Sequence, residues 1–517
     1  MSILSRLDYY LSEKGRFNSF TMHMLGYPVA LISMAILLCF TLSDLRSKTF
    51  DAFNLLYFFL FFLGLFLLFA FKSGKPRPSV GVFTIIMMYI AAILISALPY
   101  ISQGFDVKES IFEATSGITT TGLTLLDITE FNTATLLWRS ATGWIGGFMF
   151  IVLICLYISE FGLAGRYVFV AGSSSVDSDV YKPKVMKVAL RYLEIYVIST
   201  FVMSILLWIT GEDYVNSMVL SMSTISTTGF MPYTDNLEGI ATASKIVIIL
   251  FMFITMFNFT TTYVAVVRRS IRPLKEDNEF AYIGAWVLIV GAIALVEMYQ
   301  NDLMPGSMHD IVDFLLVLFS MASTTGFVVN DYTWPASMVL IFCLAAIVGG
   351  SIDSPTGGLK ASRMAIALKI MKNQVNEVAF PNEVTTTRIR NVNVSKDLAY
   401  ATLLTIIVYL MILVGGTILI SLTEIDMETA LCLATSAITT TGPGLYSLGA
   451  LTDINGFATV VCFVLMIVGR LETVLFVMML IPEFWRDLFS NTRGLKTIAD
   501  GRHLRFLSRL RYLVRRR

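Results

Sequence analysis

The chain has 517 residues, of which 56% are hydrophobic and only 15% are charged. Soluble proteins carry about 25% charged residues, so a water-soluble fold of this size would expose large apolar patches. Together with the mean hydropathy of +0.73, the composition predicts an integral membrane protein. The net charge of +1 gives no indication of a nucleic-acid partner, because nucleic-acid-binding domains are strongly basic.

The sequence carries no signature of a membrane-embedded enzyme. It has no HExxH, GxSxG or GxxxxGK[ST] motif and only three histidines, which leaves little material for catalysis or ATP hydrolysis. The five cysteines stand singly within apolar stretches, so they are expected to pack in the core rather than bind a metal or form disulfides. We therefore expect neither enzymatic activity nor an organic cofactor.

Ten stretches are long and apolar enough to cross a bilayer, since a crossing needs about 20 such residues. They lie near 23–43, 53–72, 82–103, 134–159, 185–210, 240–267, 280–300, 335–372, 397–422 and 453–485. Four connections, after residues 103, 210, 300 and 422, each hold a half-apolar stretch of about 10–15 residues, which is too short to cross. Such stretches are typical of re-entrant segments, which are tolerated where they are buried in protein or line a wet cavity.

Basic residues gather in one set of loops, which the positive-inside rule places in the cytoplasm. This set includes Lys72, Arg166, Arg268 and the tail after Arg486, whereas the opposite side has few basic residues, among them Arg139 and Lys245. Both chain ends are therefore predicted to be cytoplasmic, and the four re-entrant segments open outward. Acids gather at these openings and would concentrate cations there; they are Asp106, Glu109, Glu212, Asp213, Asp310, Asp313, Glu424 and Asp426.

The four re-entrant segments end alike, in Thr-Thr-Gly, and their glycines lie 107, 97 and 116 residues apart. The repeated residues are Thr120, Thr121 and Gly122; Thr227, Thr228 and Gly229; Thr324, Thr325 and Gly326; and Thr440, Thr441 and Gly442. Small polar residues also serve simply as helix-packing residues in membranes, but that does not explain their place after a short helix in every repeat. Glycine permits backbone that turns carbonyls toward one axis, and a ring of carbonyls can replace the hydration shell of a monovalent cation.

The stretch 335–372 is too long for one crossing and is interrupted by glycine pairs and Pro355, which cannot hold a regular helix. The interruption contains Gly349, Gly350, Ser351, Asp353, Gly357, Gly358 and Lys360. From the residues alone, either a simple kink between two half-helices or a functional loop is possible here.

Four motifs resemble the TrkH/KtrB superfamily of potassium transporters, and its TrkH branch most. They are the run from Glu113 to Gly122, Leu137-Trp138-Arg139 with Trp144-Ile-Gly146-Gly147, Gly442-Pro443-Gly444-Leu445, and Gly469-Arg470-Leu471-Glu472. The resemblance covers residues 20 to about 487 and implies four pseudo-repeats around a central K⁺ pore, preceded by an extra helix pair. It also implies a homodimer and a cytoplasmic nucleotide-binding regulatory ring of the TrkA type.

Within this superfamily, a glycine in every filter loop goes with K⁺ selectivity, whereas a serine in the first loop goes with Na⁺ transport. All four positions are glycine here, so potassium uptake is favoured, with a Na⁺-conducting or weakly selective relative as the alternative. A secondary transporter with inverted repeats fits less well, because all four loops enter from one side. K⁺ is then the transported ion, held at the four Thr-Thr-Gly loops.

The resemblance further implies that the interruption in 335–372 is an intramembrane gate loop under the filter, and that Arg470 projects into the pore beside it. Ile352, Asp353 and Pro355 depart from the small residues usual in this loop. Because a lone charge at membrane depth is costly, we hypothesise that Asp353 pairs with Arg470 or Lys360. Lys360 could instead extend its ammonium group to the cytoplasmic face.

These expectations combine into an all-α protein of the cell (inner) membrane with ten transmembrane helices and four re-entrant pore loops. The predicted parts are an N-terminal helix pair at 1–78, pore repeats at 79–184, 185–275, 276–396 and 397–487, and a basic tail at 488–517. The tail has an apolar stripe among its basic residues, which is typical of an amphipathic helix on anionic lipid. Contact with a regulatory partner is the other possibility for the tail.

Overall fold

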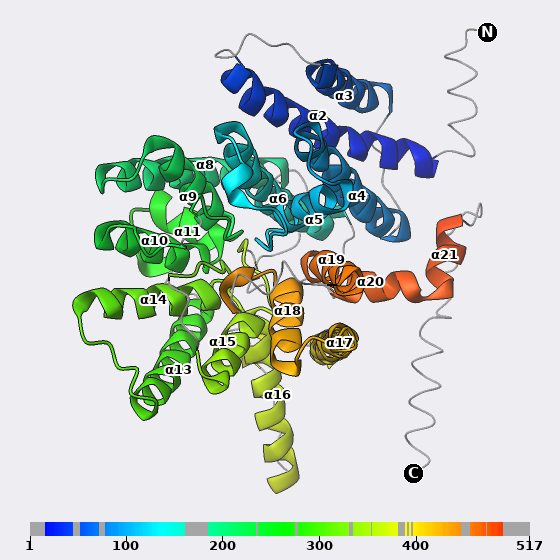
Figure 1. Ribbon diagram of the computed structural model, residues 1–517. Coiled ribbons are helices and arrows are strands. Elements are labelled where there is room, and N and C mark those ends of the chain that lie inside the picture. The colour runs from blue at the N-terminus through cyan, green and yellow to red at the C-terminus, as the bar shows by residue number, and fades with distance from the viewer. Residues whose placement is uncertain are drawn as a thin grey trace, which may run out of the picture.

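The computed structural model describes residues 16–44, 52–71, 78–160, 185–233, 236–273, 278–329, 334–352, 354–380, 388–389, 392–393, 396–445, 455–471 and 473–489. Within these ranges the chain is almost entirely helical (Figure 1). The small remainder of regular structure is a hairpin in which β1 (Arg388–Ile389) pairs antiparallel with β2 (Val392–Asn393).

Two N-terminal helices, α2 (Arg16–Asp44) and α3 (Ala52–Ala70), pack side by side at one edge of the molecule (Figure 1). Their contact is close because a Cβ at Gly64 would lie within 3.0 Å of the backbone of Ala30. Helix α2 also packs on α4 (Pro78–Ser102), which joins the pair to the rest of the molecule.

The remaining elements repeat one order four times: a long helix, a short helix, an extended loop and a further helix. The first unit is α4, α5 (Val107–Ile118), η1 (Ile128–Glu130) and α6 (Thr133–Glu160), and the second is α8 (Val185–Ile209), α9 (Tyr214–Ile225), α10 (Thr242–Thr255) and α11 (Phe259–Val267). The third is α13 (Asn278–Gln300), α14 (Met308–Ala322), α15 (Ala336–Val348) and α16 (Ala361–Ala379). The fourth is α17 (Lys396–Ser421), α18 (Met427–Thr439), η3 (Pro443–Leu445), α19 (Gly456–Arg470), α20 (Thr473–Leu480) and α21 (Pro482–Phe489). The short helices α5, α9, α14 and α18 surround the middle of the molecule (Figure 1).

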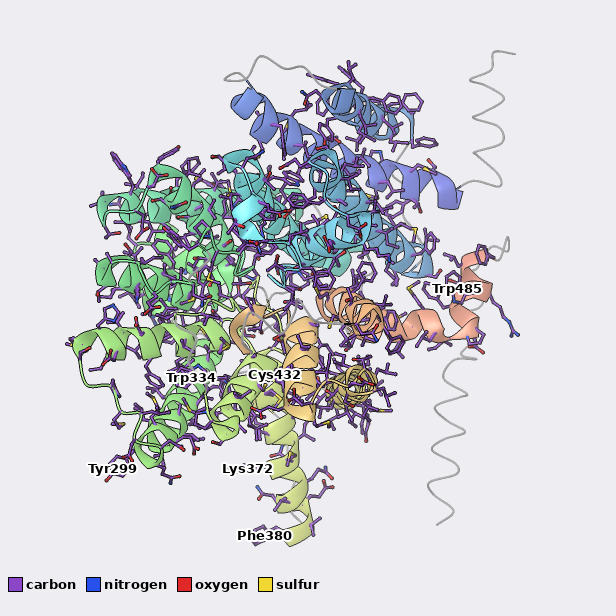
Figure 2. The ribbon with its side chains drawn as sticks, in the orientation of Figure 1. Tyr299, Trp334, Lys372, Phe380, Cys432 and Trp485 are labelled. Carbon is purple, nitrogen blue, oxygen red and sulfur yellow. The ribbon has the colours of Figure 1, made fainter. Side chains whose placement is uncertain are left out.

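Among the described residues, five helices are long and apolar enough to cross a membrane, namely α2, α4, α8, α13 and α17. Helices α3, α10, α15 and α19 are shorter but also apolar. Large apolar side chains such as Tyr299, Phe380 and Leu288 are exposed on the outside of this bundle (Figure 2). An apolar exterior of this extent suits lipid rather than water, so the chain is a multi-pass membrane protein.

Two stretches predicted as single spans are broken in the structure. The predicted span 240–267 forms α10 and α11, and the predicted span 453–485 forms α19, α20 and α21. At the first break the carbonyl of Met256 accepts a hydrogen bond from the backbone N–H of Ser351, at 2.8 Å. Hydropathy cannot reveal such breaks, because the groups that satisfy the freed backbone come from a distant part of the chain.

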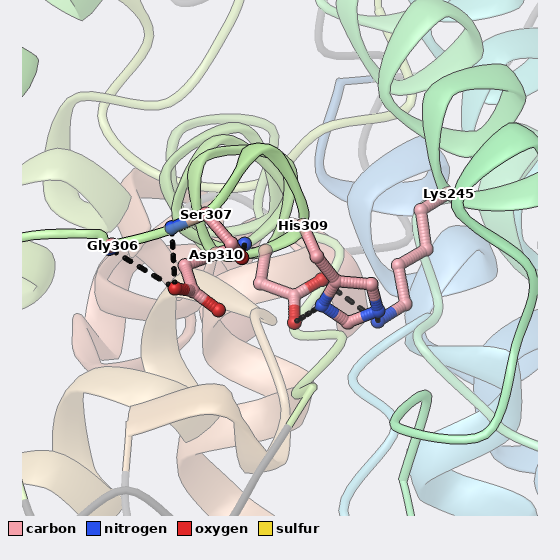
Figure 3. Close-up of polar contacts among 6 residues, drawn as sticks. Lys245, Gly306, Ser307, His309 and Asp310 are labelled. Atoms are coloured by element: carbon pink, nitrogen blue, oxygen red, sulfur yellow. Dashed lines mark hydrogen bonds and ion pairs between the residues drawn. The ribbon is translucent and has the colours of Figure 1, made fainter.

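Acidic residues at the predicted outer openings cap the short helices. The carboxylates of Asp106, Asp213 and Asp426 accept hydrogen bonds from backbone N–H groups at the starts of α5, α9 and α18. Ser307 and Asp310 form a capping box at the start of α14 (Figure 3). Hydrogen bonding lowers the pKa of Asp310 through Ser307 and that of Asp426 through the N–H of Thr429, so these carboxylates are charged at neutral pH. Some of the acids that were predicted to concentrate cations therefore also stabilise the starts of the short helices.

Lys245 and Arg139, which we expected among the outer-loop charges, are buried within the protein. The Lys245 ammonium lies 2.7 Å from the carboxylate of Asp313, and both side chains are almost fully buried. His309 contacts the other oxygen of the same carboxylate at 3.1 Å (Figure 3). The Asp313 carboxylate is therefore paired inside the protein and is almost inaccessible to solvent.

Candidate functional site

The four loops that follow the short helices share one backbone conformation. In each loop the first threonine of Thr-Thr-Gly has a left-handed φ between 51° and 55°; these residues are Thr120, Thr227, Thr324 and Thr440. Two residues later comes a glycine with φ between 78° and 89°; these are Gly122, Gly229, Gly326 and Gly442. A left-handed threonine is strained, because its β-branched side chain disfavours positive φ. Four equal departures at matching positions indicate that the conformation serves the site.

These glycines bring the loops together in a closed ring. A Cβ added at each glycine would lie less than 3.0 Å from the threonine carbonyl oxygen of the next loop, a distance that real Cβ atoms essentially never show. The pairs are Gly122 with Thr228, Gly229 with Thr325, Gly326 with Thr441, and Gly442 with Thr121. Because the last pair returns to the first loop, the loops follow one another around a single axis in chain order. The structure thus brings all twelve predicted loop residues into one buried cluster.

Hydrogen bonds behind the loops hold the strained backbone in the same way four times. The N–H of the threonine before each glycine donates to a serine carbonyl in the short helix, at 2.7–3.0 Å; the serines are Ser116, Ser223, Ser320 and Ser436. That threonine's hydroxyl also pairs with the hydroxyl two residues earlier, as in Thr119–Thr121 at 2.8 Å and Ser226–Thr228 at 2.6 Å. The same pairs recur as Ser323–Thr325 and Thr439–Thr441.

These serines were not among the site residues predicted from the sequence. They occupy the same position, six residues before the glycine, in all four repeats, so an extended motif S-x-x-[ST]-T-T-G would have identified them.

The ring offers oxygen atoms to a cation in a setting that favours positive charge. The C-terminal ends of the four short helices meet there, and each such end carries a partial negative charge. Among the described atoms, the buried hydroxyls of Thr120 and Thr440 have no hydrogen-bond partner. An unpaired buried hydroxyl costs about 1–3 kcal/mol, a cost that a coordinated ion would remove.

The interruption between α15 and α16 lies against one end of this ring. The N–H of Gly357 donates to the hydroxyl of Thr324 at 2.8 Å, and the hydroxyl of Thr227 donates to the carbonyl of Pro355 at 3.2 Å. A Cβ at Gly357 would collide with the carbonyl of Thr439. The segment thus contacts three of the four loops at the end where the short helices finish, and it is a docked loop rather than a kink.

Hydrogen bonds within the protein also hold the loop in place. Two backbone hydrogen bonds join the two ends of the loop to each other. The N–H of Leu359 donates to the carbonyl of Ile347, and the N–H of Ala361 donates to the carbonyl of Gly350. The Ser351 hydroxyl donates to the carboxylate of Glu279, a buried acid at the start of α13. Glu279 was not among the site residues predicted from the sequence, although an acid at the start of an apolar span indicates the need for a polar partner.

Lys360 lies within the site and does not extend to the cytoplasmic face. Its side chain is 2% exposed and its φ is 75°. The ammonium donates to the carbonyls of Thr356 and Ser354 in the same loop. Lys360 therefore braces the turn that returns the chain to α16.

Arg470 approaches the same loop from α19. One guanidinium nitrogen donates to the carbonyl of Pro355 at 2.8 Å, and the guanidinium carbon lies 4.1 Å from the ring centroid of Phe150. The side chain is 2% exposed. Asp353, the predicted partner of Arg470 or Lys360, lies outside the described residues.

Comparisons with known proteins agree with this architecture. The family model for the cation transport protein TrkH matches residues 50–288 and 293–486. The chain is similar to the Trk system potassium uptake protein TrkH of Escherichia coli K12, with 24% identity over 80% of this chain and 88% of the relative. It is also similar to TrkG of the same organism, with 26% identity over 80% of this chain and 87% of the relative.

The fold is also similar to that in the crystal structure of the potassium transporter TrkH from Vibrio parahaemolyticus. It aligns with a TM-score of 0.81 at 22% identity, over 91% of this chain and 100% of that chain. Since the family model covers most of the sequence, the chain belongs to the TrkH family of cation transport proteins.

Proposed function

We propose that this protein takes up potassium ions through the ring formed by the four Thr-Thr-Gly loops. The closed cyclic contact of each glycine with the next loop's threonine carbonyl supports this proposal most strongly. The relatives in Escherichia coli are named potassium uptake proteins, which favours K⁺ over other cations.

Backbone carbonyls of the loops replace the water around the ion. In this mechanism the oxygens of Thr120, Thr121 and Gly122 and of their counterparts at 227–229, 324–326 and 440–442 surround the K⁺, and the helix ends stabilise its charge. Glycine is needed because any side chain at these positions would strike a neighbouring carbonyl. The absence of a Cβ keeps the ring open to a weakly hydrated ion.

The segment 349–360 gates the pore by moving away from the ring. Its contacts with Thr227 and Thr324, together with the Arg470 hydrogen bond to Pro355, stabilise the docked position, in which the loop covers the inner end of the ring. Pro355 stiffens the segment, so movement involves the glycine pairs at its ends. Asp353 contributes by pairing with Arg470 or Lys360.

The proposal extends to the protein's assembly and location. The chain crosses the inner membrane ten times, with both ends in the cytoplasm, and works as a homodimer. A nucleotide-binding ring of the TrkA type attaches on the cytoplasmic side. The basic tail at 488–517, which from residue 490 lies outside the described residues, binds anionic lipid. The family membership and the distribution of basic residues support these statements.

Flux into proteoliposomes tests the proposal. The purified chain and Gly122→Ser are compared for K⁺ and Na⁺ uptake, with and without a TrkA-type ring. We expect K⁺-selective flux in the wild type and a loss of selectivity in Gly122→Ser. Equal K⁺ and Na⁺ flux in the wild type would instead favour a weakly selective cation transporter, and an absence of flux even with the ring present would contradict a pore.

A further inference from the structure

A buried ion pair lies behind the first loop of the ring. The Nε of Arg139, at the start of α6, donates to the carboxylate of Glu113 in the short helix α5 at 2.6 Å. The exposed fractions of the two side chains are 3% and 0%. Two charges withdrawn so completely from water carry a large desolvation cost, so the pair calls for an explanation beyond packing.

The same arginine reaches the second loop. Its Nη1 donates to the carbonyl of Met231 at 3.2 Å, and its guanidinium carbon lies 4.0 Å from the ring centroid of Phe230. Phe230 directly follows Gly229, the second glycine of the ring. A single side chain therefore connects the short helix of the first unit to the residues that leave the ring in the second unit.

Among the described residues, the third loop is held by neutral hydrogen bonds and not by an ion pair. The hydroxyl of Ser320, within the third unit, donates to the carbonyl of Phe327 at 2.9 Å, and the N–H of Leu237 donates to the carbonyl of Val328 at 3.1 Å. These are neutral hydrogen bonds. In the described part of the chain, the contact between the first and second loops is the one braced by a charged, planar group.

We propose that Arg139 is a positioning residue that sets the preference of the ring for K⁺ over Na⁺. This inference rests on the proposed function. By holding Phe230 and Met231 against α5, Arg139 fixes how far the second loop stands from the first, and therefore the separation of the Thr121 and Thr228 carbonyls. A loop released from this brace can close around the smaller Na⁺, because carbonyls discriminate between ions by their number, position and freedom to move.

Guanidinium is suited to this task for a geometric reason. It presents several N–H donors in one rigid plane and stacks on aromatic rings, so it can bind Glu113, the Met231 carbonyl and the Phe230 face at once. A lysine at this position offers a compact ammonium group on a flexible stem. Arg139→Lys would therefore keep the charge and one partner but loosen the second loop.

The test compares three variants of the brace with a second buried ion pair as control. Glu113→Gln removes the charge partner, Arg139→Lys keeps the charge, and Phe230→Leu leaves the ion pair intact while removing the aromatic face. The control is Asp313→Asn, which breaks the Lys245 pair near the start of α14. K⁺ and Na⁺ flux into proteoliposomes and thermal unfolding in detergent are measured for each.

We expect each brace variant to lower the K⁺/Na⁺ flux ratio, by about tenfold for Glu113→Gln, as for the loss of a strongly coupled contact. Asp313→Asn lowers the unfolding temperature but leaves the ratio at the wild-type value. An unchanged ratio in folded Phe230→Leu and Arg139→Lys would overturn the inference, as would an equal loss of selectivity in Asp313→Asn. If Glu113→Gln does not fold, the K⁺/Na⁺ flux ratio of Phe230→Leu tests the inference on its own. A wild type without K⁺ preference would instead refute the proposed function itself.

Discussion

Replacing Arg470 with glutamine should raise the rate of ion flux, because Arg470 holds the proposed gate loop in its docked position. The wild-type side chain donates to the Pro355 carbonyl at 2.8 Å and packs on the ring of Phe150 at 4.1 Å. Arg470 belongs to α19 and not to the loop, so we expect it to stay buried when the loop moves. The cost of burying its charge therefore largely cancels between the two positions, and the contacts with the loop decide the equilibrium.

The magnitude follows from these contacts. A hydrogen bond from a charged donor contributes about 1.5–3 kcal/mol, and glutamine can restore part of it. A net loss of about 2 kcal/mol shifts the ratio of docked to released loop by about 30-fold. Thr227→Val removes a neutral hydrogen bond to the same carbonyl, so a loss of about 1 kcal/mol should give a shift of about fivefold in the same direction.

The assay is K⁺ flux into proteoliposomes without a regulatory partner. Arg470→Gln, Thr227→Val and the double variant are compared with the wild type at equal protein content. Thr227→Val separates two explanations, because it weakens the docked loop while leaving the charge of Arg470 in place. If Thr227→Val conducts no faster than the wild type, Arg470 acts only through its charge and the tethering argument fails.

Three further outcomes follow from the structure. Gly229→Ala should cost at least about 1–2 kcal/mol of stability through its left-handed φ alone, whereas Gly239→Ala, with no atom within 4 Å of the added Cβ, should leave the unfolding temperature unchanged; equal effects would contradict the ring contact. Asp313→Asn should destabilise the protein by about 3 kcal/mol, as breaking a buried pair does, and thermal unfolding in detergent would show it. Asp426→Asn should cost a few tenths of a kcal/mol at pH 7 by removing a charge from a helix start. Because the folded-state pKa of Asp426 is lowered, this difference should vanish as the pH falls through that pKa, and a difference that grew in acid would refute the assignment.

The local features of the site were predictable from sequence because they repeat or because they break a pattern. Thr-Thr-Gly occurs four times after a short apolar stretch, and glycine with proline interrupts the predicted span that holds the proposed gate loop. Both signals depend on neighbouring residues. The left-handed glycines at 122, 229, 326 and 442 and the break after Val348 were therefore within reach.

The contacts that close the site lie between residues far apart in the chain. The ring is completed by Gly442 against Thr121, and the proposed gate loop forms hydrogen bonds with Met256 and Glu279. Hydropathy predicted one span for 240–267, yet the helix breaks at Met256. There the backbone N–H of Ser351 donates a hydrogen bond to the Met256 carbonyl. A pattern read along one segment cannot show which distant group satisfies its backbone.

The burial of charged side chains was the feature that was predicted least well from the sequence. Arg139 and Lys245 lie near the ends of predicted apolar spans, and from the sequence they were assigned to the outer loops. The structure buries both, each against an acid in a short helix. An unpaired charge at that depth is costly. An arginine or lysine at the end of an apolar span therefore predicts an acidic partner in the neighbouring short helix.

The most direct test of the proposed pore is to locate the ion. Crystals of the protein grown with Rb⁺ or Tl⁺ in place of K⁺ would give anomalous density at the bound ion. We predict density on the axis of the ring, within coordinating distance of the carbonyl oxygens of Thr121, Thr228, Thr325 and Thr441. Density confined to other places, with the ring empty at saturating Rb⁺ or Tl⁺, would contradict the assignment of these loops as the ion-selective site.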